Sequence, residues 1–221
     1  MTETENQNVH TKQLQPNYGI IAILLAGAFV SILNSTLLNV ALPSMMLDFK
    51  VEPTTIQWLA TGYMLINGII IPTTAYLIQK YSVRQLFITA MILFTIGTVF
   101  SGFAPSFAVL LTGRMIQAAG SAIMMPLLMN VLLTSFPIEK RGSAMGILGL
   151  VMTFAPAIGP TLSGWIIEQY EWRVLFYMII PFAVIVLLLA IFKLKDTKEK
   201  SKASLDSLSV MYSSIGFGGL L

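Results

Sequence analysis

Long apolar runs without a charged residue recur along this chain, and short polar segments separate them. A helix that crosses a lipid bilayer needs about 20 consecutive apolar residues. Six runs meet this length, and a seventh apolar segment at residues 208–221 is too short to cross. The six predicted spanning helices cover residues 18–42, 56–78, 86–103, 107–133, 143–167 and 174–192.

This pattern predicts an all-α integral membrane protein with four parts. We expect a polar tail at residues 1–17, a six-helix domain at 18–192, a basic linker at 193–207 and an incomplete seventh span at 208–221. Composition agrees: 56% of the residues are hydrophobic and 10% are charged, whereas soluble domains carry about 25% charged residues. The first apolar run is longer than the core of a cleavable signal peptide, so we interpret it as a span. The chain has no cysteine, which excludes a disulfide or a thiolate metal site within it.

The lysines and arginines are distributed unevenly between the two sides of the predicted bundle. Ten of the 13 lie in the tail, in the loops on the same side as the tail, or just after the sixth span. Because basic loops stay on the inner side of a membrane, the tail is expected to be cytoplasmic. The net charge of +3 therefore reflects topology, and no nucleic-acid partner is expected. The lysines of the linker suit either contact with anionic lipid or a plain connecting segment.

Arg114 is the only charged residue between Arg84 and Glu139. A cation at the centre of a bilayer costs at least about 2.5 to 3.5 kcal/mol, so it usually faces a polar cavity or a transport pathway. Gln117 and Ser121 share its helical face, at 100° per residue. Arg114 is therefore a candidate pathway residue. The alternative is an arginine that snorkels to the headgroups from about 10 Å inside the span.

Two further spans carry candidate residues. In the first span, Ser31, Asn34 and Ser35 lie on one face, with Asn39 at its edge, where they either line a pathway or hold helices together. In the fifth span, small residues recur every four positions, a spacing that lets helix backbones touch. Pro156 and Pro160 interrupt the same helix, and proline removes a backbone donor. The fifth span is therefore either a bent helix at a moving interface or a static kinked helix. The small residues of that repeat are Ala155, Gly159 and Ser163.

Four segments in this order resemble the major facilitator superfamily, and within it the drug:proton antiporters with fourteen spans. These are the multidrug and lincomycin-resistance exporters of the EmrB/QacA type. The segments resemble the motifs of span one, of the loop between spans two and three, of span four and of span five. They read LNSTLLNVALP at 33–43, LIQKYSVR at 77–84, LLTGRMIQAAG at 110–120 and APAIGPTLSG at 155–164.

The resemblance implies a role for each group of residues. Arg114 would belong to the region that relays protons and contacts substrate, with Gln117, Asn34, Ser121 and Ser31 as the other candidate pathway residues. The antiporter motif would comprise Pro156, Gly159, Pro160 and Gly164, and the cytoplasmic gating loop would comprise Gln79, Lys80 and Arg84.

Two positions depart from the family's pattern. Asn34 stands where the span-one motif usually has an aspartate, and an amide does not take up a proton at physiological pH. Gln79 and Ser82 stand where the loop motif usually has aspartate and glycine, so a salt-bridged latch is not expected. None of the six spans has an interior Asp or Glu, so a coupling carboxylate would lie elsewhere.

By the same resemblance, the chain would be the N-terminal half of a proton-coupled exporter in a bacterial cell membrane. Its partners would be amphipathic drug-like small molecules, protons, membrane lipid and a C-terminal half. The alternative is a truncated, non-transporting membrane fragment or an assembly partner. An enzyme is not expected, because HExxH, GxSxG and P-loop motifs are lacking and the one histidine, His10, lies in the tail. No cofactor or metal is expected either.

Overall fold

The computed structural model describes residues 17–194, which form seven helices and no strand. Six of the helices are long and apolar enough to cross a membrane, and this confirms the predicted all-α membrane architecture. The predicted tail (1–17, apart from Asn17), most of the linker (193–207) and the predicted start of a seventh span (208–221) lie outside the described residues. The helices are α1 (Tyr18–Phe49), α2 (Pro53–Ile56), α3 (Trp58–Lys80), α4 (Val83–Gly102), α5 (Phe107–Ser135), α6 (Ile138–Gln169) and α7 (Arg173–Lys193).

Several helices extend beyond the apolar runs that predict them. α1 continues to Phe49, seven residues past the predicted end, and α6 begins at Ile138 rather than at residue 143. Lys140 and Arg141, which we expected in a loop, therefore lie inside α6. Charged residues mark the end of an apolar run. They do not mark the end of the helix, which can continue from the apolar layer into water. Glu139 in the first turn of α6 also favours this start, because a carboxylate complements the positive N-terminus of a helix.

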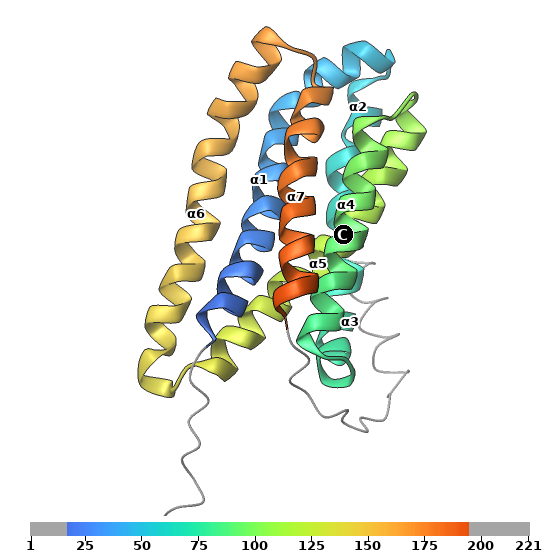
Figure 1. Cartoon of the computed structure of the whole chain (residues 1–221). Coiled ribbons are helices and arrows are strands. Elements are labelled where there is room, and N and C mark those ends of the chain that lie inside the picture. Colours follow the sequence, from blue (N-terminus) through green and yellow to red (C-terminus); the bar gives the residue numbers. More distant parts are fainter. Residues whose placement is uncertain (1–16, 195–221) are drawn as a thin grey trace, which may run out of the picture.

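The six long helices run side by side along the length of the molecule, as Figure 1 shows. The beginning of α1 and the end of α7 lie at the same end of the bundle, which we call the Lys80 end because α3 finishes there. The opposite end, where α7 begins beside Trp172, is the Trp172 end. Such an arrangement agrees with an even number of crossings.

Two helices form the centre of the bundle. α1 packs against α5, α6 and α7, and α5 packs mainly against α3 and α4. In an apolar stretch of 18 consecutive residues from each span, 50% are buried in α1 and 56% in α5, but only 11% in the α2–α3 span and 17% in α6. Within residues 17–194, α3 and α6 therefore leave most of their surface uncovered, while α1 and α5 are enclosed.

Glycines bring the backbones of α4 and α5 into direct contact. A Cβ atom at Gly97 of α4 would lie 2.5 Å from the backbone nitrogen of Gln117, and one at Gly113 of α5 would lie 2.7 Å from the Ser101 hydroxyl. A side chain at Gly120 would likewise overlap the backbone of α4. Close backbone approach through small residues is a main source of helix association in membranes. The close contact between α4 and α5 fixes the orientation of α5, and therefore the position of the face that carries the candidate pathway residues.

Candidate functional site

Arg114 lies in the interior of the bundle, at the centre of a small polar network. Its side chain is 2% exposed, and its Nη1 atom donates a hydrogen bond to Oε1 of Gln117, one turn along α5. Gln117 Nε2 donates in turn to the Thr98 hydroxyl at 2.7 Å. The Thr98 hydroxyl donates to the Phe94 carbonyl at 2.6 Å, which completes its hydrogen bonding within α4. The network therefore links α5 to α4 and holds the guanidinium in one position.

A tyrosine of α3 covers one face of this guanidinium. Arg114 Cζ lies 4.2 Å from the centroid of the Tyr63 ring, within the range of a cation–π interaction. Asn67, one turn further along α3, donates from Nδ2 to the Tyr63 carbonyl at 2.8 Å. Three helices therefore contribute to the surroundings of Arg114: α5 supplies it, α4 fixes its amide partner and α3 supplies the ring.

A cavity of about 320 Å³ opens beside the Arg114 guanidinium. Its wall is mixed: two amides, two hydroxyls and a guanidinium lie beside apolar side chains of α3. Cavities of 300–1,000 Å³ with a few polar groups in an apolar wall are typical small-molecule sites. The lining residues are Ser35, Asn39, Ala60, Tyr63, Met64, Asn67, Gly68, Ile71 and Arg114.

No carboxylate pairs with Arg114 among residues 17–194. The two ion pairs in which both residues lie within 17–194 involve Arg173, at the Trp172 end. The Nε atom of Arg114 is buried and has no hydrogen-bond partner in the described part of the chain. The guanidinium thus has an amide and an aromatic ring as neighbours, and it keeps a free donor.

The structure separates the polar residues that we predicted on α1. The Ser31 hydroxyl lies 2.5 Å from the Ser121 hydroxyl, which joins α1 to α5 in the way expected of a packing contact. Asn34 is 3% exposed, and its Nδ2 atom is buried without a partner within residues 17–194. Of the polar residues predicted on this face of α1, Ser35 and Asn39 line the cavity. A pathway role for Asn34, Ser31 and Ser121 stays a prediction.

The predicted small-residue contact of the fifth span is present between α6 and α1. Ala155, Gly159 and Ser163 are the buried face of the middle of α6. The Ser163 hydroxyl donates to the Leu37 carbonyl at 2.8 Å, and a side chain at Gly159 would overlap Thr36.

The other members of the antiporter motif lie on the uncovered side of α6. The helix continues through Pro156 and Pro160, both of which are exposed, and a Cβ at Gly164 would meet open space. One face of α6 is thus fixed by small residues while the opposite face is unoccupied within the described residues. A role of this motif in exchange stays a prediction.

The predicted gating residues lie at the Lys80 end, where α3 turns into α4. Gln79 and Lys80 are exposed, and Lys80 Nζ lies 5.5 Å from the Tyr81 ring centroid. Ser82 begins α4 as the first half of a capping box with Gln85. Arg84 Nη2 donates to the Ile191 carbonyl at 3.1 Å, in the last turn of α7, where a cation complements the helix dipole. Arg84 therefore joins α4 to α7, and a gating role for this loop stays a prediction.

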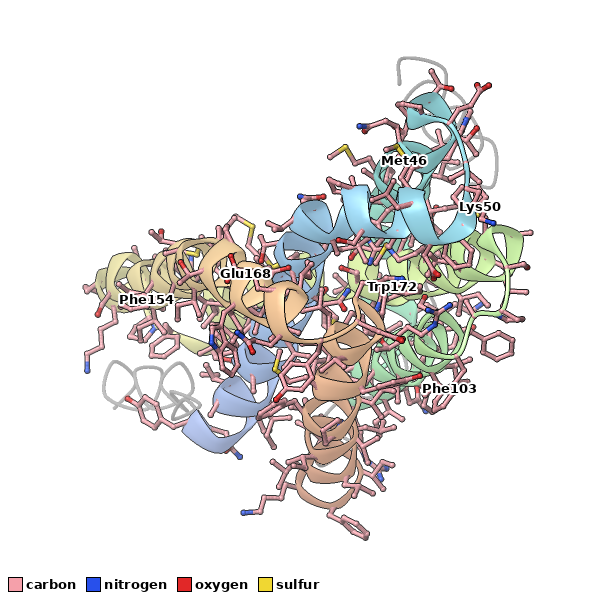
Figure 2. The ribbon with its side chains drawn as sticks, turned by 90° about the horizontal axis from the view of Figure 1, so that it is seen from above. Met46, Lys50, Phe103, Phe154, Glu168 and Trp172 are labelled. Carbon is pink, nitrogen blue, oxygen red and sulfur yellow. The ribbon has the colours of Figure 1, made fainter. Side chains whose placement is uncertain are left out.

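A second cluster of interactions closes the Trp172 end of the bundle. Arg173 Nη1 forms an ion pair with Asp48 Oδ2 at 2.9 Å, and the Trp172 indole donates to the same oxygen at 3.1 Å. Arg173 also donates to the Ala104 carbonyl between α4 and α5, at 3.4 Å. These contacts, which we call the Asp48 clasp, join the end of α1 to the start of α7 and to the α4–α5 turn. Figure 2 looks down on this end of the bundle and labels Trp172.

Sequence reasoning missed three polar residues of the site: Tyr63, Asn67 and Thr98. Tyr63 and Asn67 are four residues apart in span two, a spacing that puts them on one helical face, and this signal was available. The sequence gives no such signal for Thr98. A threonine in a spanning helix usually donates a hydrogen bond to a backbone carbonyl of its own helix, as Thr98 also does here.

Known proteins resemble this chain in sequence and in fold. Residues 24–216 match the family described as Major Facilitator Superfamily. Among curated relatives, an uncharacterized MFS-type transporter, YcnB of Bacillus subtilis, is 61% identical over 91% of this chain and 43% of its own length. The lincomycin resistance protein LmrB of the same species is 43% identical over 91% of this chain and 42% of its own length. The multidrug export protein EmrB of Haemophilus influenzae is 30% identical over 95% of this chain and 42% of its own length.

Solved structures show the same fold at low sequence identity. The human organic anion transporter MFSD10 has a TM-score of 0.75 and 14% identity, and the match covers 90% of this chain and 53% of that one. A D-xylose-proton symporter has a TM-score of 0.67 and 16% identity, over 90% of this chain and 52% of that one. The chain therefore spans about half or less of the proteins it matches.

Proposed function

The chain belongs to the major facilitator superfamily, and from that membership we propose that it acts as the N-terminal half of a multidrug exporter. The exporter would move amphipathic drug-like molecules out of a bacterial cell in exchange for protons. The resistance and export proteins among its relatives support the direction and the substrate class. The whole molecule would span the cell membrane several times with its N-terminus in the cytoplasm, in contact with lipid.

The observation that carries this proposal is the cavity beside Arg114. It combines a guanidinium, two amides and two hydroxyls with apolar side chains, which is the chemistry an amphipathic ligand requires. A buried cation is costly in a membrane helix and is usually retained for function. The polar network of Gln117 and Thr98 keeps the guanidinium in place without neutralising its charge.

Transport in this superfamily uses two six-helix halves around a site near the midplane of the bilayer. Within residues 17–194, α3 and α6 have the least covered surfaces, which suits contact with a second half. Under this proposal the α1–α6 contact through Gly159 and Ser163 would let α6 stay attached to α1 while its other face meets the second half.

Proton coupling needs a group that can bind a proton inside the membrane. The described acidic residues lie at or beyond the ends of the helices, and the buried Asn34 is an amide. We therefore assign the coupling carboxylate to sequence outside residues 17–194. The entry of one proton supplies about 2.3 kcal/mol per 100 mV of membrane potential, which is enough to drive export.

The proposal is tested in bacterial cells that lack their own drug pumps. The complete open reading frame that contains this chain is expressed, and cells are loaded with a panel of anionic, neutral and cationic amphipathic dyes. On energisation, expressing cells should lose at least one dye faster than cells with the empty vector. A protonophore should remove the difference. Equal rates of loss with and without expression, for every dye, would contradict export.

The second candidate function is a non-transporting membrane fragment or assembly partner. It is favoured by one observation: the chain spans only 38–43% of the length of three relatives that it matches in sequence. Expression of residues 1–221 alone separates the two. If these residues alone lower dye accumulation, the fragment alternative is wrong.

A further inference from the structure

The cavity beside Arg114 has an unbalanced charge. Of its nine lining residues, Arg114 is the only one with a formal charge, and the others are neutral polar or apolar. Two amides, Asn39 and Asn67, and two hydroxyls, Ser35 and Tyr63, complete its polar wall. A site with one cation and no acidic group attracts anions and repels cations.

The hydrogen bonding of Arg114 points the same way. A guanidinium has five N–H donors, and the described residues accept from Nη1, through Gln117. Nε is buried without a partner in residues 17–194. The Tyr63 ring lies over a face of the group, whereas the N–H donors lie along its edge. Planar donor edges of this kind bind carboxylates, often through two parallel hydrogen bonds.

Burial without a counter-charge makes an anion the favourable occupant. Arg114 is 2% exposed, and a buried cation that lacks an acidic partner is strongly destabilising. A ligand that brings a negative group to the guanidinium edge supplies the missing counter-charge. A cationic ligand in the same cavity would add repulsion to the cost of desolvation.

We propose that the cavity between α1, α3 and α5 selects amphipathic ligands that carry a carboxylate or a similar anionic group, which binds the Arg114 guanidinium. The apolar part of the ligand packs against Met64 and Ile71 of α3. This inference rests on the proposed function, since it names the substrate class of the same site. The negative group has one competing source, a side-chain carboxylate from sequence outside residues 17–194, and the experiment separates the two.

The test uses two xanthene dyes of similar size and opposite charge, fluorescein as the anion and rhodamine 123 as the cation. The protein is purified from its complete open reading frame in lipid nanodiscs, and dye binding is measured by fluorescence polarisation. Efflux of both dyes is measured in parallel from cells. The variants are Arg114→Gln, Arg114→Lys and, as a matched loss of charge far from the cavity, Lys140→Gln in the exposed first turns of α6.

Wild-type protein should bind fluorescein about tenfold more tightly than rhodamine 123, the scale of one charge-assisted hydrogen bond. Arg114→Gln should remove this preference, and Lys140→Gln should preserve it. Arg114→Lys should give an intermediate preference, because lysine keeps the charge but loses the planar donor edge. The thermal stability of each variant without dye shows whether it is folded. If Arg114→Gln does not fold, the comparison of wild type with Arg114→Lys decides the matter.

Each remaining outcome has a defined meaning. Equal binding of the two dyes, or tighter binding of rhodamine 123, overturns the inference and indicates that the chain supplies its own carboxylate to Arg114. Export of dyes without a charge preference overturns the inference while export stands. Binding of fluorescein without any efflux leaves the inference in place and overturns export. If neither dye binds and no dye of the larger panel is exported, both are wrong.

Discussion

Two arginines in this bundle have similar aromatic neighbours and opposite electrostatic surroundings. Arg114 stacks on Tyr63 at 4.2 Å, and Arg173 stacks on Trp172 at 4.3 Å. Arg173, at the Trp172 end, pairs with the Asp48 carboxylate at 2.9 Å and also lies 3.8 Å from Glu171. Arg114, in the interior, has the neutral amide of Gln117 in place of an acid.

The difference shows where charge serves structure and where it serves binding. The Asp48 clasp is partly exposed, and an ion pair at such a position contributes only about 0–1 kcal/mol. A buried cation without an acidic partner lowers stability, so a fold that retains one gains something else from it. We interpret the Asp48 clasp as a set of contacts that stabilises the packing of the helix ends. We interpret Arg114 as the charge that serves function. Substitutions that make the surroundings of one arginine more like those of the other test this interpretation.

Arg114→Ala should have the largest effect. It removes the only charge from the cavity wall, and efflux should fall by roughly a hundredfold, the scale of 2–3 kcal/mol for hydrogen bonds to a charged group. Membrane insertion should be unchanged, because the substitution makes the helix more apolar. The control, Arg173→Ala, should retain most of the efflux. Full efflux in Arg114→Ala would make this residue a packing element.

Gln117→Glu gives Arg114 the acidic partner that Arg173 already has. The new carboxylate should pair with the guanidinium and compete with anionic ligands, so fluorescein affinity should fall about tenfold. Thermal stability should stay close to that of the wild type, since the buried cation is now balanced. Gln117→Leu is the matched control: it breaks both hydrogen bonds of the amide without adding charge, and it should lower stability rather than abolish the preference for anions. An unchanged affinity in Gln117→Glu would show that ligands do not reach Arg114.

Tyr63→Leu removes the aromatic face under the guanidinium. A desolvated cation–π contact contributes up to about 2 kcal/mol, so Tyr63→Leu should lower the melting temperature by a few degrees. Tyr63→Phe keeps the ring and should remain close to the wild type. The measurement is thermal unfolding of the purified protein in nanodiscs. Equal melting temperatures of the Leu and Phe variants would show that the stacking contributes nothing.

Asp48→Asn should have the smallest effect. It removes the ion pair with Arg173 but leaves an oxygen that can accept from the Trp172 indole. The expected loss of stability is about 0.2–1 kcal/mol, and it should shrink at high salt, which screens partly exposed charges. The measurement is the difference in melting temperature between the wild type and Asp48→Asn, at low and at high salt. A large loss that salt does not alter would mean that the clasp is a buried structural centre.

The membrane architecture could be predicted from sequence because lipid imposes it. A spanning segment must satisfy all of its backbone groups internally, so each long apolar run becomes a helix. All six predicted spans are helices for this reason. Helix ends were harder, because the apolar pattern stops where a helix such as α6 continues into water through Glu139, Lys140 and Arg141. The short α2, which starts at Pro53, was not predicted for the same reason.

Arg114 could be identified from sequence, but most of its neighbours could not. Its charge stands out in an apolar helix, and Gln117 follows at a spacing that shares its face. Tyr63 approaches from another helix, and that contact depends on how α3 packs against α5, which periodicity within one helix does not specify. The glycine contacts between α4 and α5, at Gly97 and Gly113, likewise depend on how the two helices pack, which the sequence of either helix does not specify.

The most direct test of the central claim measures the electrostatic potential in the cavity. The 221 residues contain no cysteine, so Asn67→Cys introduces a thiol in the cavity wall, with any cysteine elsewhere in the reading frame replaced by serine. Labelling rates are compared for methanethiosulfonate reagents that carry a sulfonate or an ammonium group, each normalised to its reaction with glutathione. The sulfonate should be favoured, and adding Arg114→Gln should reduce its advantage by at least tenfold, since one nearby charge at an effective dielectric constant of about 20 contributes more than about 1.4 kcal/mol to the difference between the two reagents. A ratio that is the same with and without Arg114, or a thiol that neither reagent reaches, would contradict an accessible cationic cavity.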